Sequence, residues 1–600
     1  MSSSESYPSK VLVSGELSSD GLALLGKSFD VHEYRQALLE PNLLEIIANF
    51  DALVVRSETK VTKVVLQAGR NLKVVARAGV GVDNIDVAEA TKLGIVVVNS
   101  PSGNIGAAAE HTIALMMAMA RRIPDACTSL KNGTWQRSKF VGVEVKGKVL
   151  GIVGLGKVGL IVARLAKGLG MTVVAFDPYT SPTIAAAAGV RLVSLLTELL
   201  PIVDFLTIHT PLIASTRGMI GPTELEEMKP GSRILNVARG GTVDEGALLA
   251  TLKSGHLAGA ALDVFITEPP TADSVTAKLI AHPRVIATPH LGASTIEAEE
   301  NVSIDVCEQV VDILVNGSLP RSAVNAPLIL PEEYQKLQPF VRLVEKMGSL
   351  YTQHYDGRPG GSMNRNTFEL TYQGDLASLT NTKPLFAAFI KGLLAPVSGS
   401  EGINVNIVNA EIVAHDRGIV VNEQRFREPN EDTSYSSLVT LVARPPSRAS
   451  SLTRGAKNLL RSQDEGSSPR IISGTCSGDR PLITRLGKFE AQFEPEGNLL
   501  ICEDNDLPGK VGVVGSILGQ EGVNINFMTV SSESSDDETG SKVESRIADK
   551  DGSACYENEG PLLGSQRVLM ILGIDREVSV HIMGEIARML GVVTARVVKL

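Results

Sequence analysis

Three polar residues in the middle of the chain are of the types needed to oxidise a hydroxy acid. Arg239, Glu268 and His290 each follow shortly after an apolar, strand-like run. Oxidation of a 2-hydroxy acid requires a cation for the carboxylate, a base for the hydroxyl proton and a carboxylate that orients the base. Taken singly, the three have simpler interpretations as a surface arginine, a loop glutamate and a capping histidine. Their occurrence together in this order favours catalysis.

A glycine-rich turn lies upstream, between the apolar run 150–153 and a helix-like stretch. Gly154 permits a tight turn, Gly156 lets the backbone approach a pyrophosphate, and Gly159 lets the helix pack on the strand. The next run ends in Asp177, where a carboxylate can accept both ribose hydroxyls and repels a 2′-phosphate. The pattern predicts a site for NAD rather than NADP, with a purely structural turn as the alternative.

These residues need a scaffold that gathers them at one edge. Strand-like runs alternate with helix-like stretches as far as about residue 325, which is typical of parallel sheets with crossover helices. In a doubly wound sheet, residues beyond the carboxyl ends of the strands converge on the ligand. The predicted strands are 10–15, 52–56, 73–78, 95–99, 150–153, 171–177, 205–210, 233–237, 260–264 and 285–288, and the predicted long helices are 106–121 and 294–316.

The sequence pattern is different in the C-terminal half. Residues 335–490 mix short strands and helices without an obvious catalytic set, and 444–470, rich in Ser, Arg, Pro and Gly, is predicted to be a flexible insertion. A βαβ-like unit at 498–530 follows. A second predicted flexible insertion, acidic and Ser-rich, occupies 531–560 before a closing strand–helix–strand at 566–600.

Composition limits the possible functions. A chain of 600 residues is too long for one core, so several domains are expected. The net charge of −10 repels nucleic acid and anionic metabolites, so an anionic substrate needs a locally basic pocket. Charged residues interrupt every long apolar stretch and no targeting pattern is seen, which predicts a cytoplasmic protein without membrane contact. The five scattered cysteines favour a reducing compartment and argue against a zinc site.

Longer motifs around these residues resemble one enzyme family, the D-isomer-specific 2-hydroxyacid dehydrogenases. The motifs are the glycine loop, NVARGG at 236–241, LDVF with EPP at 262–270, TPHLGAST at 288–295, VVARAGVGVDN at 74–84 and NSPSGNIGAAAEHT at 99–112. The match covers the chain to about residue 330, and the last domain resembles an ACT regulatory module. The resemblance implies NAD-dependent oxidation of 3-phospho-D-glycerate to 3-phosphohydroxypyruvate, the first step of L-serine biosynthesis.

The resemblance also assigns roles to residues. It implies that His290 is the acid/base, Glu268 its partner, and Arg239 the clamp on the carboxylate and the reacting oxygen. The residues that it places at the NAD site are Val80, Gly154, Gly156, Lys157, Val158, Gly159, Asp177, Thr210, Val237, Ala238, Arg239, Asp263, His290, Gly292 and Ala293.

The fold implied by the resemblance is α/β with four domains. A Rossmann-type NAD domain, 105–290, is inserted in a flavodoxin-like substrate domain made of 5–104 and 291–327, with a cleft that closes by hinging. An α+β intervening domain at 335–490 and a ferredoxin-like βαββαβ ACT domain at 498–600 follow. The resemblance implies a homo-oligomer, either a dimer of NAD domains or a tetramer.

A phosphorylated hydroxy acid needs cations beyond Arg239. Arg56 and Arg77 end predicted strands on the cleft side, and the loop 131–140 adds further cations around Trp135. In the family's dimers this loop reaches into the neighbouring subunit's cleft. Solvated surface charge is the alternative for each cation. The predicted substrate-binding residues are Arg56, Arg77, Ser102, Gly103, Asn104, Arg137 and Lys139.

In the last domain, Asp506 stands before a Pro-Gly turn and Asn524 follows a helix and a glycine. The two loops resemble those of ACT modules that meet at a dimer interface and bind a small amino acid. The resemblance implies L-serine as an effector held by Asp506 and Asn524. Asp504 departs from the aromatic or imidazole side chain often found there, and a purely structural dimerisation module is the alternative.

Several other residues attract attention but have simpler interpretations. His111 is predicted to be a satisfied core or dimer-interface residue, Cys127 a packing residue, and the stripe 116–119 core or interface. Two rival functions stay open: a reductase of glyoxylate or hydroxypyruvate, and an NAD-gated binding protein of the corepressor type. Only turnover excludes the second.

Overall fold

The computed structural model describes residues 9–320, 322–355, 367–397, 404–426, 435–444, 470–506, 508–533, 567–588 and 592–600. Contacts divide the chain into two compact units. The N-terminal unit comprises Met1–Asp86 and Val97–Val324, and the C-terminal unit comprises Val87–Val96 and Asn325–Leu600.

The first sheet of the N-terminal unit has the strand order β2-β1-β3-β4-β5, which is the flavodoxin-like order. Its strands are β1 (Lys10–Ser14), β2 (Asp30–Tyr34), β3 (Ala52–Val55), β4 (Val74–Arg77) and β5 (Val96–Asn99), and its helical connections include α1 (Ser19–Gly26), α2 (Glu40–Ile46), η1 (Ile47–Asn49) and α3 (Lys63–Ala68). Strand β3 is buried along its whole length, as continuous apolar runs in parallel sheets usually are. Strand β2, an exposed edge, was not predicted.

Helix α13 (Ile296–Leu314) returns to this sheet after the second sheet has been completed. It packs against α1 and β4, and the Ser303 hydroxyl accepts the Ser18 N–H at 3.2 Å. A Cβ at Gly21 would lie only 3.2 Å from the Ser303 backbone, so a glycine permits this close approach. The predicted insertion of one α/β domain within another is confirmed.

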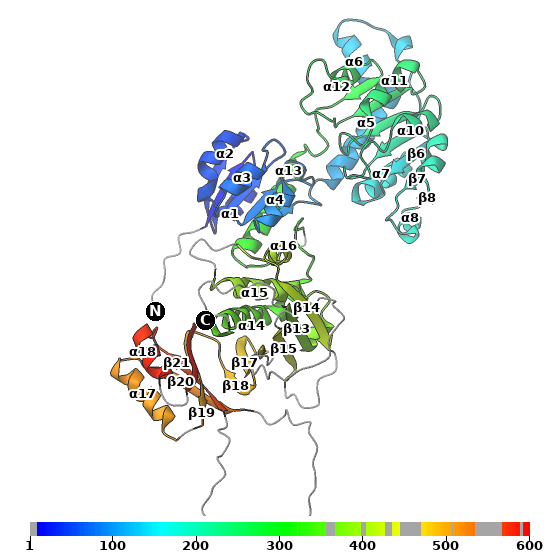
Figure 1. The fold of residues 1–600 in the computed structure, drawn as a ribbon. Helices are drawn as coiled ribbons and strands as arrows, with labels where there is room; N and C mark the ends of the chain where they lie inside the picture. Colours follow the sequence, from blue (N-terminus) through cyan, green and yellow to red (C-terminus); the bar gives the residue numbers. More distant parts are fainter. Residues whose placement is uncertain are drawn as a thin grey trace, which may run out of the picture. The chain divides into compact units, whose positions relative to one another are not determined.

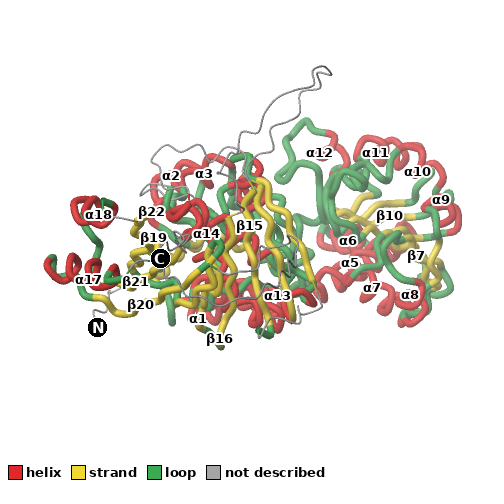
Figure 2. The backbone as a smooth tube through the Cα atoms, turned by 60° about the horizontal axis from the view of Figure 1, so that its bottom comes forward, coloured by secondary structure: helices red, strands yellow, loops and turns green. Residues whose placement is uncertain are grey.

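The second sheet is doubly wound, with the strand order β12-β11-β10-β9-β6-β7-β8 and parallel neighbours. One face is covered by α5 (Ile105–Arg121), α7 (Lys157–Gly168) and α8 (Pro182–Ala187), and the other by α9 (Leu196–Leu199), α10 (Pro222–Glu227), α11 (Glu245–Ser254) and α12 (Val275–Ile280) (Figure 2). This is the Rossmann strand order, so the predicted Rossmann-type domain is confirmed. Its strands are β6 (Val149–Val153), β7 (Thr172–Phe176), β8 (Arg191–Val193), β9 (Phe205–Ile208), β10 (Arg233–Asn236), β11 (Gly259–Leu262) and β12 (Val285–Ala287); α6 (Ile123–Lys131), η2 (Arg137–Phe140) and η3 (Leu200–Ile202) lie between them in the sequence.

The C-terminal unit contains a long helix besides its shorter elements. Helix α14 (Pro331–Tyr355) spans 25 residues and packs on α15 (Lys383–Leu394). Glycines allow the two backbones to meet, since a Cβ at Gly392 would lie 1.9 Å from the Glu345 carbonyl oxygen. The adjoining sheet has the order β14-β13-β15-β16-β17-β18. Its strands are β13 (Thr367–Gly374), β14 (Val420–Phe426), β15 (Ser437–Arg444), β16 (Arg470–Ser477), β17 (Arg480–Leu486) and β18 (Phe489–Phe493), with η4 (Asp375–Ser378) and α16 (Ala410–Asp416) between them.

Helix α4 (Val87–Lys92) belongs by contact to this unit, although in sequence it joins β4 to β5. Asn406 and Asn404 both donate their side-chain N–H to the Gly94 carbonyl, at 2.6 and 3.2 Å. Asn409 donates to the Lys92 carbonyl at 3.3 Å. Three asparagines therefore satisfy carbonyls at and just beyond the end of α4.

The last domain has the predicted βαββαβ order, in an antiparallel sheet β20-β21-β19-β22. Both helices, α17 (Lys510–Gln520) and α18 (Val580–Ala587), pack on one face of it (Figure 1). The strands are β19 (Asn498–Asn505), β20 (Ile525–Ser532), β21 (Arg567–Ile574) and β22 (Val592–Lys599). The predicted insertion 531–560 began too early, because Ser532 still pairs with Val568.

The rest of the two predicted insertions, residues 534–560 and 445–469, lies outside the described residues. Arg444 and Arg470, the ends of the predicted insertion 444–470, are strand residues.

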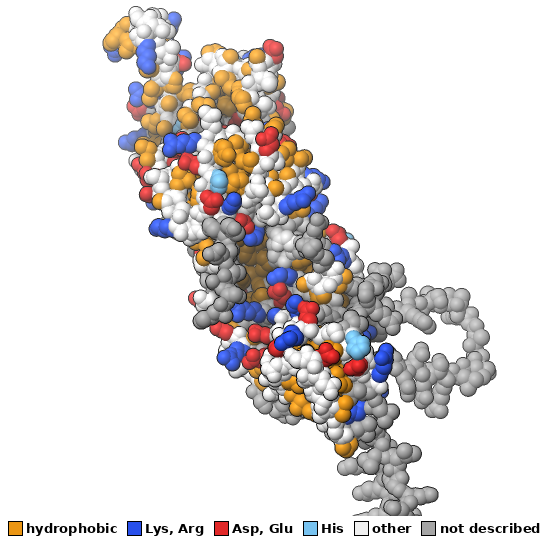
Figure 3. Space-filling model, turned by 90° about the vertical axis from the view of Figure 1, so that its left-hand side faces the viewer, with side chains coloured by type: hydrophobic (Ala, Val, Ile, Leu, Met, Phe, Trp, Pro, Cys, Tyr) orange, Lys and Arg blue, Asp and Glu red, His pale blue; other side chains and the backbone are white. Residues whose placement is uncertain are grey.

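On the face drawn in Figure 3, acidic and basic side chains are interspersed. Among the described residues, no helix is long and apolar enough to cross a membrane. Cys127 is exposed, so the packing role predicted for it was wrong.

Candidate active site

The polar residues predicted to act together follow neighbouring strands of the second sheet. Strands β9 to β12 are parallel neighbours, so their carboxyl ends lie along one edge, where ligands bind in doubly wound sheets. Thr210 follows β9, Arg239 follows β10, Asp263 follows β11 and His290 follows β12. The sheet brings these four residues to one edge.

Glu268 and His290 form a hydrogen-bonded pair. His290 Nδ1 lies 2.8 Å from Glu268 Oε2, and Glu268 Oε1 accepts the Phe265 N–H at 2.8 Å. Burial raises the pKa of Glu268, but the hydrogen bonds from His290 and Phe265 outweigh it and hold that pKa below its ordinary value. A carboxylate only accepts hydrogen bonds, so Nδ1 carries the hydrogen and Nε2 keeps the lone pair that can take up a proton.

The backbone of His290 is held in the left-handed region by Asp263. Its φ is 56°, which costs a non-glycine residue about 1–2 kcal/mol. The His290 N–H donates to the Asp263 carbonyl at 2.9 Å. The next two N–H groups, of Leu291 and Gly292, donate to the Asp263 carboxylate at 2.8 Å each. One buried aspartate therefore fixes the loop that presents the imidazole.

His111 and Thr288 complete the donors to Asp263. Thr288 Oγ1 donates to Asp263 Oδ1 at 2.6 Å, and His111 Nε2 lies 3.2 Å from both of these oxygens. Burial raises the pKa of Asp263, but the hydrogen bonds from His111, from Thr288 and from the loop outweigh it and lower that pKa. His111 does have partners, as the sequence predicts, but they lie in the site. The apolar helix around His111 gave no signal of this.

Arg77 and Arg239 form a cationic centre. Arg77 Nε is buried and has no hydrogen-bond partner among the described residues. Burial, together with the charges of Arg239 and Arg56, lowers the pKa of Arg77 to about 10 against the opposing charge of Asp83. Arg239 Nε donates to Asp83 Oδ2 at 3.1 Å and its Nη1 to the Ala238 carbonyl at 2.7 Å. An unpartnered guanidinium N–H among further cations suits an anion.

Two residues outside the predicted set hold Arg239. Asn236 is buried; its Nδ2 donates to the Arg239 carbonyl at 2.9 Å, and its Oδ1 accepts the Ala238 N–H at 3.1 Å. Asp83 makes the ion pair described above. Their positions within NVARGG and VGVDN were the signals that could have identified them.

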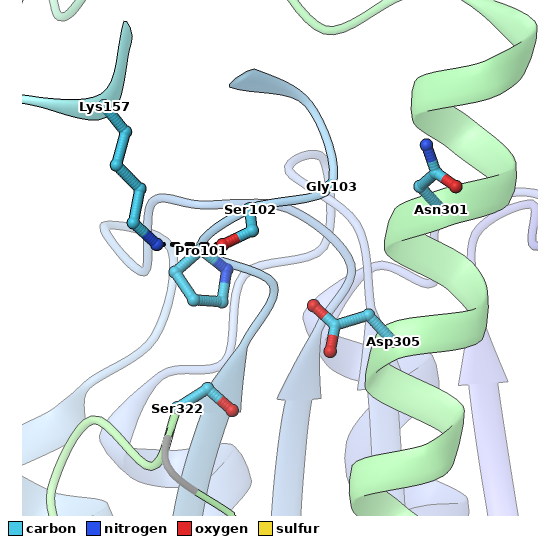
Figure 4. A pocket seen from close by; sticks show the side chains of 7 residues that line it. All are labelled: Pro101, Ser102, Gly103, Lys157, Asn301, Asp305 and Ser322. Carbon is cyan, nitrogen blue, oxygen red and sulfur yellow. Dashed lines mark hydrogen bonds between the residues drawn. The ribbon is translucent and has the colours of Figure 1, made fainter. Parts of the chain in front are cut away.

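A cavity of about 540 Å³ brings predicted substrate and cofactor residues together. Lys157 Nζ, at the start of α7, donates to Ser102 Oγ at 2.9 Å, and Asp305 of α13 projects from the opposite side (Figure 4). Asn104 is the residue that precedes α5, without a side-chain hydrogen bond to the helix. The lining residues are Pro101, Ser102, Gly103, Lys157, Asn301, Asp305 and Ser322.

The glycine loop fits a dinucleotide. A Cβ at Gly154 would lie 2.6 Å from the His209 carbonyl oxygen, and one at Gly159 would lie 2.2 Å from the Gly154 carbonyl oxygen, so close packing requires both glycines. Gly156 instead faces open space, where a pyrophosphate can approach the helix N-terminus. Thr210 Oγ1 is buried without a hydrogen-bond partner among the described residues, which leaves it available to a bound ligand.

Asp177 is held in place at the end of β7. Its Oδ2 accepts the Leu155 N–H at 2.7 Å, and its Oδ1 accepts the N–H groups of Tyr179 and Thr180 at 2.8 and 3.0 Å. Carboxylate oxygens retain further acceptor capacity, so ribose hydroxyls are still accommodated. Of the other residues predicted to line the NAD site, Val237 and Gly292 are buried, Val158, Ala238 and Ala293 are half-buried, and Val80 is exposed.

The chain is similar in sequence to known proteins. The family model "D-isomer specific 2-hydroxyacid dehydrogenase, NAD binding domain" matches residues 113–292, and "D-3-phosphoglycerate dehydrogenase intervening domain" matches 336–456. D-3-phosphoglycerate dehydrogenase 2, chloroplastic, of Arabidopsis thaliana is 41% identical over 87% of this chain and 80% of its own length. D-3-phosphoglycerate dehydrogenase of Synechocystis sp. is 42% identical over 87% of each chain. The chain belongs to the D-3-phosphoglycerate dehydrogenase family. It is an NAD-dependent oxidoreductase, as the sequence predicts.

Two further cations predicted to bind the substrate are exposed in the single chain. Arg137 and Lys139 are exposed on η2, which follows a helix with no buried residue. In the part of the chain that the structure describes, no side-chain hydrogen bond or ion pair joins either residue to Arg77, Arg239 or His290.

The predicted effector residues Asp506 and Asn524 are both exposed, and no hydrogen bond joins them among the described residues. The Asn524 N–H donates to Asp575 Oδ1 at 3.0 Å. Asp504 is buried and accepts a hydrogen bond from Lys510 Nζ at 3.0 Å. Asp504, which departs from the family pattern, is therefore paired with Lys510.

Proposed function

We propose that the chain oxidises 3-phospho-D-glycerate to 3-phosphohydroxypyruvate with NAD, the first step of L-serine biosynthesis. The observation that carries the proposal is the Glu268–His290 pair at the same sheet edge as Arg239. The loop that carries Arg239 packs tightly on the loop that carries Glu268, since a Cβ at Gly240 would lie 1.9 Å from the Phe265 carbonyl oxygen. Curated D-3-phosphoglycerate dehydrogenases that are 41% and 42% identical support the substrate.

The residues divide the work of removing two hydrogens. NAD held by the glycine loop and Asp177 would supply the acceptor for the C2 hydride. His290 Nε2 accepts the hydroxyl proton, and Glu268 stabilises the imidazolium that forms. Arg239 binds the substrate carboxylate and polarises the reacting oxygen. In the reverse direction His290 returns the proton.

The cationic centre gives the proposed specificity. The net charge of −10 disfavours an anion elsewhere on the protein. Arg56 and Arg77 supply the charge for the phosphate, and Ser102, Gly103 and Asn104 supply hydrogen-bonding groups for the carboxylate. The unpartnered Nε of Arg77 supports this assignment.

Initial rates of NADH formation test the proposal. The value of kcat/KM for 3-phospho-D-glycerate should exceed that for D-glycerate at least about 100-fold, because each charge-assisted hydrogen bond contributes about 1.5–3 kcal/mol. Higher efficiency in reducing glyoxylate or hydroxypyruvate would make the chain a different reductase. No turnover of any of these compounds would make it an NAD-gated binding protein.

We propose that Arg137 and Lys139 act on the phosphate bound in the other subunit of a homodimer. Exposed apolar side chains on this segment support a covered face, since Trp135 is 76% and Val141 78% exposed. Dimers that combine Arg137→Ala and His290→Ala subunits should recover one working site. Activity no greater than that of the separate mutants counts against the shared site.

We propose that L-serine binds to the ACT domain through Asp506 and Asn524 and slows turnover. To do so, serine must bind one arrangement of the domains more tightly than another. Calorimetry of L-serine binding to the full chain, compared with the Asn524→Ala variant, tests the site. No heat in the unaltered chain, together with serine-independent kinetics, would leave a dimerisation module.

We propose the domain boundaries given by the sequence: 5–104 with 291–327 for substrate, 105–290 for NAD, 335–490 for the intervening domain and 498–600 for the ACT domain. The positions of the four sheets support them, although β18 continues to Phe493. Limited proteolysis should cut first between these ranges, and early cuts within a sheet would move a boundary.

A further inference from the structure

We propose that His111 is a positioning residue for the dehydrogenase reaction. It fixes the Asp263 carboxylate, and Asp263 in turn fixes the backbone of His290. The inference rests on the proposed function and deepens it, because it adds to the site a residue that works through another and does not touch the substrate.

The direction of the hydrogen bonds follows from the atoms involved. His111 Nε2 lies 3.2 Å from Asp263 Oδ1 and from Thr288 Oγ1. The carboxylate only accepts, and the Thr288 hydroxyl gives its one hydrogen to that carboxylate at 2.6 Å. His111 Nε2 must therefore carry a hydrogen and share it between the two oxygens.

The carboxylate depends on few donors. Asp263 is fully buried, and a buried charge is tolerated only when hydrogen bonds replace its hydration. Among the described residues, the loop supplies Thr288 and the N–H groups of Leu291 and Gly292. His111 is the donor that comes from outside the loop, from helix α5. It ties the loop to a rigid element of 17 residues.

The hydrogen bond is what an imidazole adds at this position. The neighbouring buried residues of α5 are apolar or small, such as Ala109, Leu115 and Met116. A leucine would fill a similar volume at position 111 but would leave Asp263 with one donor fewer. The side chain of His111 is only 20% exposed, so water would replace the lost donor poorly.

Loss of the His111 donor should change the electrostatic environment of His290. The Asp263 charge would be compensated less, which favours the protonated form of the nearby imidazole. Oxidation requires that His290 be unprotonated, so the acid limb of the kcat–pH profile would move to higher pH. Glutamine retains a neutral N–H donor and should restore the wild-type limb.

Steady-state kinetics of the full chain with NAD and 3-phospho-D-glycerate test the inference. His111→Leu should lower kcat about tenfold or more and raise the pH of the acid limb, whereas His111→Gln should stay within about threefold with the limb unmoved. The matched control is His256→Leu, which removes a 2.8 Å contact between a histidine and the Met228 carbonyl away from the site. The acid limb of the kcat–pH profile of His256→Leu should not move, whatever the melting temperature of this variant.

The inference is overturned if His111→Leu keeps the wild-type kcat and acid limb, or if kcat falls as far in His111→Gln as in His111→Leu. Loss of kcat at constant limb position in both variants would indicate a merely structural residue. A wild-type enzyme that oxidises another hydroxy acid would contradict the proposed substrate alone, and the same variants would then be measured on that acid. A wild-type enzyme without turnover overturns both proposals.

Discussion

The carboxyl edge of the second sheet and the core of the C-terminal unit both bury titratable groups, but with opposite results. At the edge, hydrogen bonds overcome the effect of burial and keep Asp263 charged. In the C-terminal unit, burial, together with the charges of Arg596 and Arg470, lowers the pKa of His354 to about 4. Burial likewise raises the pKa of Tyr372 well above its ordinary value.

The difference teaches where chemistry can occur. Burial alone selects the neutral form of a group, so His354 and Tyr372 can pack but are poorly suited to exchange protons near neutral pH. Loops beyond strand ends supply the N–H groups that keep a carboxylate ionised, and Glu268 is paired with a half-exposed histidine there. The shifted pKa values of Asp263 and Glu268 are accompanied by such donors, unlike that of His354.

Replacing His290 and, separately, His354 should give the sharpest contrast between the two regions. His290→Ala should lower kcat by about 10²–10⁴-fold, the usual contribution of a general base, with nearly unchanged NAD binding. His354→Leu should leave the kcat of the folded enzyme within about twofold. Stopped-flow rates and NAD titration measure both, and a similar fall in the two variants would erase the contrast.

Acid should destabilise the C-terminal unit through His354. As pH falls below about 6.5 the unfolded histidine takes up a proton, but the folded one does not until about pH 4. Stability is therefore lost as pH falls across this window, by about 3 kcal/mol in total.

Melting temperatures between pH 7 and pH 4.5 check this loss. His354→Leu should flatten the decline, whereas His415→Leu, which alters a histidine 90% exposed, should not. A decline of equal slope in all three proteins would show that His354 is not the group responsible.

The cationic centre can be broken without touching the Glu268–His290 pair. Arg77→Met should raise the KM for 3-phospho-D-glycerate by about 10–100-fold, because a charged hydrogen-bond donor is lost. The KM for NAD should stay the same, and Arg217→Met, at an exposed arginine, is the control. An unchanged KM for phosphoglycerate would move the phosphate away from Arg77.

The smallest expected effect concerns Asp177. Asp177→Ser removes the charge that repels a 2′-phosphate, so the ratio of kcat/KM for NAD to that for NADP should fall about tenfold. Ratios from initial rates with each cofactor measure this. Equal efficiency with both cofactors in the unaltered enzyme would contradict the assignment.

Much of the fold could be predicted because the buried parallel strands are continuous apolar runs, which is a local signal. Strand β2 was not predicted because its sequence, DVHEY, lies at an exposed edge and lacks such a run. The catalytic candidates were evident from their types after strand ends. The roles of His111 and Asp83 were not evident, although Asp83 lies within the VGVDN motif, because their partners lie 152 and 156 residues away in the sequence and only the fold brings them together.

The pH dependence of kcat in Glu268→Gln tests the central claim most directly. The Glu268 carboxylate stabilises the protonated form of His290, so its loss should let the base deprotonate at lower pH. The acid limb of the profile for 3-phospho-D-glycerate oxidation should move to lower pH, with a reduced plateau. A limb at the wild-type position would show that Glu268 and His290 do not act as a pair.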